Sequence, residues 1–217
     1  MKRIDRMENK VLISKSLGSV TVLATIPKDP KTLIVLAHGA GAGMRHPFME
    51  SLAGELINRN IGVIRFNFLY MEKGIRRPDP SAIAEKTVAM VVHYAHEHYP
   101  SLSLYTAGKS FGGRMTSQWI AKESPACVKG IIFYGFPLHP VGNPSVERAH
   151  HLKNIQIPML FLQGTKDKLA DISLLEETCS SLPLATLQKF EGADHSFKIG
   201  KQNLVLGLAD STIAWIK

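Results

Sequence analysis

The chain has 217 residues, of which 45% are hydrophobic and 20% are charged, a balance that is ordinary for a globular protein. This length can bury a substantial core and predicts one domain over residues 1–217. The formal net charge is +8, but the basic residues are scattered and form no nucleic-acid motif. We therefore expect a solvated basic surface and no nucleic-acid partner.

Three further features bear on location. No run of about 18 apolar residues occurs, so no membrane-spanning helix or membrane partner is expected. The first ten residues are charged, and no small-residue cleavage site follows them, which argues against a secretory signal. Cys127 and Cys179 are far apart and lack the C-x-x-C spacing, as expected of reduced thiols in a cytoplasmic protein.

Strand-like and helix-like segments alternate along the chain, which predicts an α/β fold with a mostly parallel central sheet and helices on both faces. The chain opens with a predicted hairpin at residues 11–16 and 19–26. The later predicted strands are residues 32–37, 62–66, 102–107, 129–134, 157–163 and 184–190. The predicted helices are residues 47–60, 81–98, 114–122, 171–181 and 204–216, with a polar loop at 70–80.

The strand at 102–107 runs directly into the segment Gly108-Lys109-Ser110-Phe111-Gly112. This is the G-x-S-x-G pattern of a nucleophile elbow, in which a sharp strand-to-helix turn exposes the serine hydroxyl. The two glycines remove side chains that would collide at such a turn. The same letters resemble the end of a phosphate-binding P-loop, but that motif requires glycine at position 103, where this chain has Ser103.

A serine nucleophile needs a base, and the base works best when a carboxylate orients it. Asp167 follows the predicted strand 157–163, while its rival Asp171 is better placed as the N-cap of the next helix. His195 lies in a short polar loop after the last predicted strand. Ser110, Asp167 and His195 thus occur in the order of an elbow-type triad, each after a strand.

A Gly-rich loop at residues 36–44 follows the first predicted parallel strand. Small residues let backbone amides approach a developing negative charge, and we expect the amides of Ala40 and Phe111 to form an oxyanion hole. The loop does not fit the dinucleotide pattern G-x-G-x-x-G ahead of a helix. No metal or organic cofactor is expected, because the histidines at 93, 96 and 98 lack a metal-binding spacing.

With these motifs in place, the chain resembles the α/β-hydrolase superfamily over nearly its full length. It more narrowly resembles the dienelactone-hydrolase-like enzymes and, within them, the subfamily of testis-expressed and NSL-complex-subunit homologues. Residues 37–43, 70–79, 108–114, 134–140 and 163–167 carry that likeness. The resemblance implies Ser110 as nucleophile, Asp167 as acid and His195 as base. Dienelactone hydrolases proper have cysteine at the elbow, so their substrate is not carried over.

The expected activity is hydrolysis of an ester, thioester or related acyl bond of a small substrate, as in a carboxylesterase. Two alternatives stay open: a non-catalytic module that binds a partner, and a peptidase or C–C hydrolase with the same triad. The sequence does not fix the oligomeric state.

The segment after residue 134 is too short for a substantial lid, which predicts an open, shallow site. Arg76 and Arg77 would either meet an anionic group or belong to a solvated loop. The residues expected to line the site are Tyr70, Met71, Arg76, Arg77, Phe136 and Leu138.

Overall fold

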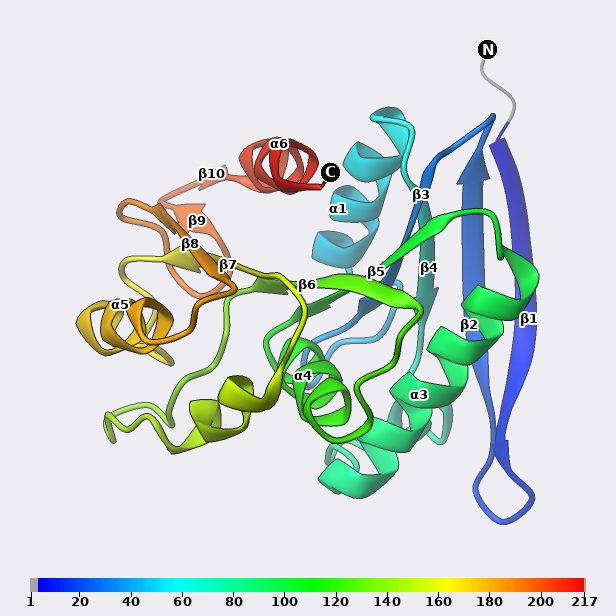
Figure 1. The fold of residues 1–217 in the computed structure, drawn as a ribbon, viewed down its shortest axis with the longest axis horizontal. Helices are drawn as coiled ribbons and strands as arrows, with labels where there is room; N and C mark the ends of the chain where they lie inside the picture. Colours follow the sequence, from blue (N-terminus) through cyan, green and yellow to red (C-terminus); the bar gives the residue numbers. More distant parts are fainter. Residues whose placement is uncertain (1–3, 217) are drawn as a thin grey trace.

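The structure, a computed structural model, describes residues 4–216. Eight strands form one sheet in the order β1-β2-β4-β3-β5-β6-β7-β8 (Figure 1). They are β1 Ile4–Ser14, β2 Gly18–Pro27, β3 Thr32–Ala37, β4 Gly62–Phe66, β5 Ser103–Lys109, β6 Val128–Tyr134, β7 Met159–Gly164 and β8 Ala185–Phe190. The strands from β4 to β8 in this order run parallel, whereas β1 pairs with β2 and β2 with β4 in antiparallel fashion. The predicted mostly parallel sheet is confirmed.

The central strands β3 and β4 are buried along their whole length, as expected for parallel strands covered by helices on both faces. Strand β1 differs, because it begins at Ile4 rather than near the predicted residue 11. Its first seven residues are exposed and mostly polar, so no hydrophobic pattern marks them. Their pairing with β2 runs without interruption from Ile4, opposite Pro27, to Leu12, opposite Ser19.

Helices cover the two faces of the sheet, with α1 and α6 on one face and α3 and α4 on the other (Figure 1). The helices are α1 Pro47–Asn58, α2 Leu69–Glu72, α3 Ser81–His98, α4 Phe111–Glu123, α5 Ile172–Ser180 and α6 Val205–Trp215. A 3-10 helix, η1, spans Glu147–Asn154, and a small hairpin pairs β9 Lys198–Ile199 with β10 Gln202–Asn203. The sequence patterns did not predict α2, η1 or this hairpin.

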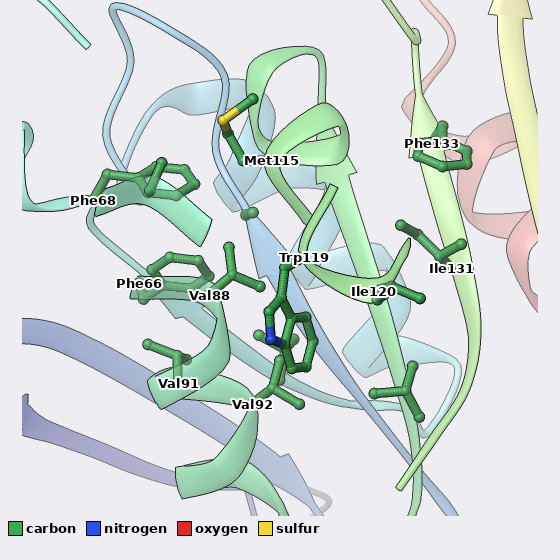
Figure 2. Close-up of a cluster of buried hydrophobic side chains, with 14 of the residues drawn as sticks. Phe66, Phe68, Val88, Val91, Val92, Met115, Trp119, Ile120, Ile131 and Phe133 are labelled. Carbon is green, nitrogen blue, oxygen red and sulfur yellow. The ribbon is translucent and has the colours of Figure 1, made fainter. Parts of the chain in front are cut away.

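The core beneath α3 and α4 fixes the helix that follows Ser110. Trp119 of α4 lies among side chains of α3 that include Val88 and Val92, and Phe66 of β4 lies near them (Figure 2). Full burial of such a side chain is worth about 1.5–3 kcal/mol. Because α4 begins at Phe111, this packing also fixes the position of the turn that carries Ser110.

The connection between β6 and β7 contains η1 and no larger structured insertion. The prediction of a fold without a substantial lid is therefore confirmed. Across residues 4–216, no helix has both the length and the apolar character needed to cross a bilayer.

Candidate active site

Ser110 sits at the turn between β5 and α4 with a backbone φ of 49° and ψ of −114°, an uncommon conformation for a residue with a side chain. The glycines around it are required by contact distances. A Cβ on Gly108 would lie 2.2 Å from the backbone nitrogen of Gly113, and one on Gly112 would lie 2.5 Å from the carbonyl oxygen of His38. The structure thus confirms that these two glycines make room for the sharp turn.

His195 and Asp167 are joined directly. The His195 Nδ1 atom lies 2.6 Å from Asp167 Oδ2. The Asp167 side chain is fully buried, whereas that of His195 is 27% exposed. Because Nδ1 faces the carboxylate, the other ring nitrogen, Nε2, is left for contact with a substrate or a nucleophile. The structure therefore brings the two predicted partners of the serine together across the ends of β7 and β8.

Further hydrogen bonds fix the Asp167 carboxylate. Gln163 Nε2 donates to Asp167 Oδ2 at 2.7 Å, and the Leu169 amide donates to Asp167 Oδ1 at 2.8 Å. Gln163 is itself fully buried, and its Oε1 atom accepts from the Phe136 amide at 2.9 Å. The carboxylate thus faces the histidine in a single orientation. Sequence reasoning missed Gln163, although a polar residue near the end of a buried strand, four residues before Asp167, could have indicated it.

A cavity of about 730 Å³ holds Ser110 and His195 together on its wall. Its apolar wall comes from the start of α1, from the turn after Asp167 and from the start of α6. The residues concerned are Pro47, Phe48, Met49, Leu169 and Val205. Ala40 also lines it, as do Lys109, Ser196 and Lys198. The cavity can therefore accept an apolar group next to the serine.

The six residues predicted to line the site do not line this cavity. For Tyr70, Phe136 and Leu138 the prediction was wrong, because their side chains are buried in the core below the sheet edge, at 1% exposure or less. Met71 is half-buried and packs against the same core. Arg76 and Arg77 are exposed in the loop after α2.

The Gly-rich loop after β3 is anchored through one carbonyl group. His38 Nε2 accepts from the Phe68 amide at 3.1 Å, so Nδ1 carries the hydrogen and donates to the Gly39 oxygen at 2.8 Å. The Tyr70 hydroxyl also donates to the Gly39 oxygen, at 3.4 Å. Burial lowers the pKa of His38 to about 4, so the ring is neutral at pH 7 and keeps this donor–acceptor pattern.

This anchor also orients Ala40. The Gly39 carbonyl and the Ala40 N–H belong to one trans peptide unit and point in opposite directions. Fixing the carbonyl toward His38 and Tyr70 therefore turns the Ala40 N–H away from the core. Within residues 4–216, neither the Ala40 amide nor the Phe111 amide has a hydrogen-bond acceptor. Both amides predicted to form the oxyanion hole thus lack a partner within residues 4–216, and Ala40 lines the cavity that holds Ser110.

Lys109 links the elbow to the histidine loop. Its Nζ atom donates to the backbone oxygen of His195 at 2.7 Å and lies within 6.0 Å of the ring centres of Phe48 and Phe197. Burial lowers the pKa of Lys109 to about 8, while the charge of Asp167 opposes this shift. The Lys109 side chain therefore connects the turn that carries Ser110 to the loop that carries His195. It is not part of a phosphate-binding loop.

The remaining sequence candidates have structural roles. The Asp171 side chain accepts from the Leu174 amide at 3.1 Å, which confirms it as the N-cap of α5. His93 contacts the Trp119 ring, and His98 bonds to a backbone carbonyl of its own helix. In the part of the chain that the structure describes, no group of three or more His, Cys, Asp or Glu side chains could hold a metal ion.

Comparison with known proteins identifies the family to which the chain belongs. The family model described as an α/β hydrolase domain matches residues 30–206, so the chain belongs to that family. Its fold is similar to that of an α/β serine hydrolase homologue from Coxiella burnetii, with 19% identity, a TM-score of 0.78, and coverage of 100% of this chain and 99% of the other.

Two further solved structures share the fold. A serine hydrolase without a lid from Xanthomonas campestris has 19% identity and a TM-score of 0.75, with 98% of this chain and 95% of the other covered. A dienelactone hydrolase from Anabaena variabilis has 17% identity and a TM-score of 0.74, with 97% and 96% covered. At these identities the likeness establishes the α/β-hydrolase fold alone. The Xanthomonas campestris protein is the neighbour described as having no lid.

Proposed function

We propose that this protein is a serine hydrolase that cleaves an ester, thioester or related acyl bond of a small substrate. The observation that carries the proposal is the 2.6 Å contact between Asp167 and His195, whose residue lines the same cavity as Ser110. Family membership and the fold of the serine hydrolase neighbours support it. The narrower kinship with the testis-expressed and NSL-complex-subunit homologues is also a proposal, based on sequence segments alone.

In the proposed reaction, the Ser110 hydroxyl oxygen attacks the substrate carbonyl while His195 Nε2 takes its proton. Asp167 holds the imidazole through Nδ1 and stabilises the imidazolium that forms. The negative charge that develops on the carbonyl oxygen is met by the Ala40 and Phe111 amides, and each such donor is typically worth about 3–4 kcal/mol of barrier. Collapse of this intermediate expels the alcohol or thiol, which leaves with the proton held by His195.

Water then enters the site and completes the cycle. His195 takes a proton from the water, whose oxygen attacks the acyl group on Ser110. The acid product leaves, and the Ser110 hydroxyl recovers its proton from His195. Every proton in this sequence passes through one imidazole, so no metal or organic cofactor is required. The apolar wall formed by Phe48, Leu169 and Val205 suits the acyl or alcohol group of the substrate.

Turnover of p-nitrophenyl butyrate by the wild-type chain and by two serine variants tests the proposal. Ser110→Ala should lose turnover by a factor on the order of 10⁴ or more while its thermal unfolding stays that of the wild type. Ser196→Ala is the matched control, because Ser196 lines the same cavity next to His195. Its turnover should stay within about threefold of wild type, since no side-chain contact of the triad is lost. Turnover that survives in Ser110→Ala would refute the assignment.

A further inference from the structure

A second hollow, of about 360 Å³, lies between α1 and the sheet edge formed by β1, β2 and β4. None of the residues that line it also lines the Ser110 cavity. Three arginine side chains from separate parts of the chain meet there. They are Arg6 of β1, Arg45 just before α1, and Arg65 of β4. The proposed hydrolysis uses none of them.

Strand register explains how Arg6 and Arg65 come to the same face. Leu23 of β2 lies opposite Arg65 on one side and Glu8 on the other, and Arg6 is two residues before Glu8. Residues two apart in a strand project to the same face, so Arg6, Leu23 and Arg65 all face α1. The pattern is fixed by the ladder of hydrogen bonds and does not depend on flexible loops.

Arg65 is a buried cation whose partners are incomplete. Its residue is 8% exposed, and its Nη1 atom donates to the Met44 oxygen at 2.7 Å. The nearest carboxylate oxygen, on Glu50, is 3.7 Å away, which is too far for a hydrogen bond. A guanidinium has five N–H donors, and within residues 4–216 no Arg65 nitrogen is both buried and without a hydrogen-bond partner, so the donors that are not bonded to the protein reach solvent. Arg65 therefore retains donors for a further acceptor.

The neighbouring charges leave a positive balance. Arg45 pairs with Glu8, and Glu50 faces Arg65, while no carboxylate pairs with Arg6 within residues 4–216. Three guanidinium groups thus meet two carboxylates, and the Glu50 side chain is 52% exposed and free to turn toward water. Burial is the main cause that lowers the pKa of Arg65; Glu50 opposes this shift, and the charges of Arg45 and Arg6 add to it.

Gly54 keeps the hollow open. It lies in the interior of α1, where glycine costs about 1 kcal/mol relative to alanine. A Cβ at this position would meet no atom within 4 Å, so packing does not require glycine here. Leu23, Ala53 and Ile57 add an apolar wall beside the arginines. The hollow therefore combines cationic donors that reach solvent, empty space and an apolar surface.

We propose that this hollow binds a small organic phosphate, with Arg65, Arg6 and Arg45 on the phosphoryl oxygens and the body of the ligand against Leu23 and Ile57. A phosphate monoester carries one to two negative charges and three terminal oxygens, which match several guanidinium groups better than the two oxygens of a carboxylate do. The volume lies near the lower end for small-molecule sites. The site is separate from the proposed hydrolase centre and does not depend on its activity.

Isothermal titration of phenyl phosphate into the full chain, in phosphate-free buffer of low ionic strength, tests this proposal. We expect saturable binding of one equivalent, with benzoate at least about tenfold weaker because it offers fewer acceptors. Gly54→Leu fills the hollow without changing a charge and should weaken binding at least about tenfold, as should Arg65→Gln. Thermal unfolding of each variant checks that it is folded. If Arg65→Gln does not fold, the binding measured for Gly54→Leu and Arg6→Gln still decides the test.

Two controls distinguish binding in this hollow from binding elsewhere on the basic surface or in the Ser110 cavity. Lys15→Gln removes one charge from an exposed turn and should leave binding unchanged. Ser110→Ala should also leave it unchanged, because the two cavities share no residue. The proposal is overturned if no saturable binding occurs, if Gly54→Leu binds like the wild type, or if Lys15→Gln weakens binding as much as Arg6→Gln. Equal affinity for benzoate would overturn the choice of phosphate.

Discussion

Ser110 and His195 are held in place by different kinds of force. At the elbow the determinant is steric, since Gly108 and Gly112 leave no room for even one extra carbon atom against the neighbouring backbone. At the histidine loop the determinants are hydrogen bonds, which the His195 ring donates to Asp167 and which Lys109 donates to the His195 backbone oxygen. The contrast implies that substitutions of the elbow glycines Gly108 and Gly112 disrupt the fold, whereas changes around His195 reduce turnover in a fold that remains intact.

After Ser110→Ala, the largest expected effect on turnover is that of Asp167→Asn. Asparagine has the same shape, but its amide cannot stabilise the imidazolium and favours the wrong tautomer of His195, so kcat should fall by about 10³–10⁴. The melting temperature should stay close to wild type, as checked by circular dichroism alongside p-nitrophenyl butyrate kinetics. A fall in kcat of less than tenfold would show that His195 does not depend on this carboxylate.

Two Gly→Ala changes test the steric requirement for glycine at the elbow. Gly108→Ala places a carbon 2.2 Å from a backbone nitrogen and should cost about 4 kcal/mol or more of unfolding free energy. Gly54→Ala meets only open space inside a helix and should add about 1 kcal/mol. Urea denaturation of both variants measures the difference. Similar stabilities for the two would show that the elbow relaxes more easily than its backbone contacts imply.

Local sequence was sufficient to predict one part of this site and insufficient for another. Ser110, Asp167 and His195 each follow a strand whose hydrophobic pattern is plain, and parallel strands bring their carboxyl ends to one edge. The walls of the cavity depend on packing between distant segments. Phe136 follows a strand end just as Asp167 does, yet its side chain turns into the core and stacks edge-on against Phe133 and Phe161. No local pattern distinguishes these two outcomes.

Anchoring groups were likewise beyond the reach of the sequence. Gln163 and His38 act through partners that are near in space only because β7 lies beside β6 and β3 lies beside β4 in the sheet. The early start of β1 was missed for a related reason, since an exposed edge strand needs no hydrophobic alternation. The candidate site residues with strong local sequence constraints could thus be proposed from the sequence, and the residues that support them through space could not.

Lys109→Met should give a smaller effect than Asp167→Asn. Methionine keeps the packing between Phe48 and Phe197 but removes the charged donor to the His195 oxygen, worth about 1.5–3 kcal/mol, so kcat should fall about tenfold or somewhat more. KM should change little, because Lys109 positions the histidine loop. Lys198→Met is the control, since Lys198 lines the same cavity without this bond. An equal fall in kcat in both variants would mean that the positive charge in the cavity supports turnover and that the hydrogen bond from Lys109 to the His195 oxygen does not.

The smallest effect concerns acid stability. Burial lowers the pKa of His151 to about 4 in the folded state, from the value of 6.5 that is usual for an exposed histidine. Between these values the unfolded chain binds the proton and the folded chain does not, so stability falls as pH drops from 6.5 toward 4. His151→Gln can keep the contact with Ser117 and cannot titrate.

Urea unfolding at pH 7.0 and 5.0 measures that difference. Between pH 7.0 and 5.0, the unfolding free energy of the His151→Gln variant should fall less than that of the wild type. The difference should be on the order of 1 kcal/mol, after allowance for partial exposure of the ring. His38, whose pKa is lowered in the same way, should account for part of the loss that remains. An identical fall in unfolding free energy in the two proteins would show that His151 titrates normally in the folded chain.

Intact-mass analysis after exposure to a fluorophosphonate shows whether Ser110 is an activated nucleophile. We expect one adduct on the wild type, none on Ser110→Ala, and strongly slowed labelling of His195→Ala, because the serine proton then has no acceptor. Labelling of Ser110→Ala to the same extent, or no adduct on well-folded wild type, would contradict the account and favour a hydrolase-fold module that binds without catalysis.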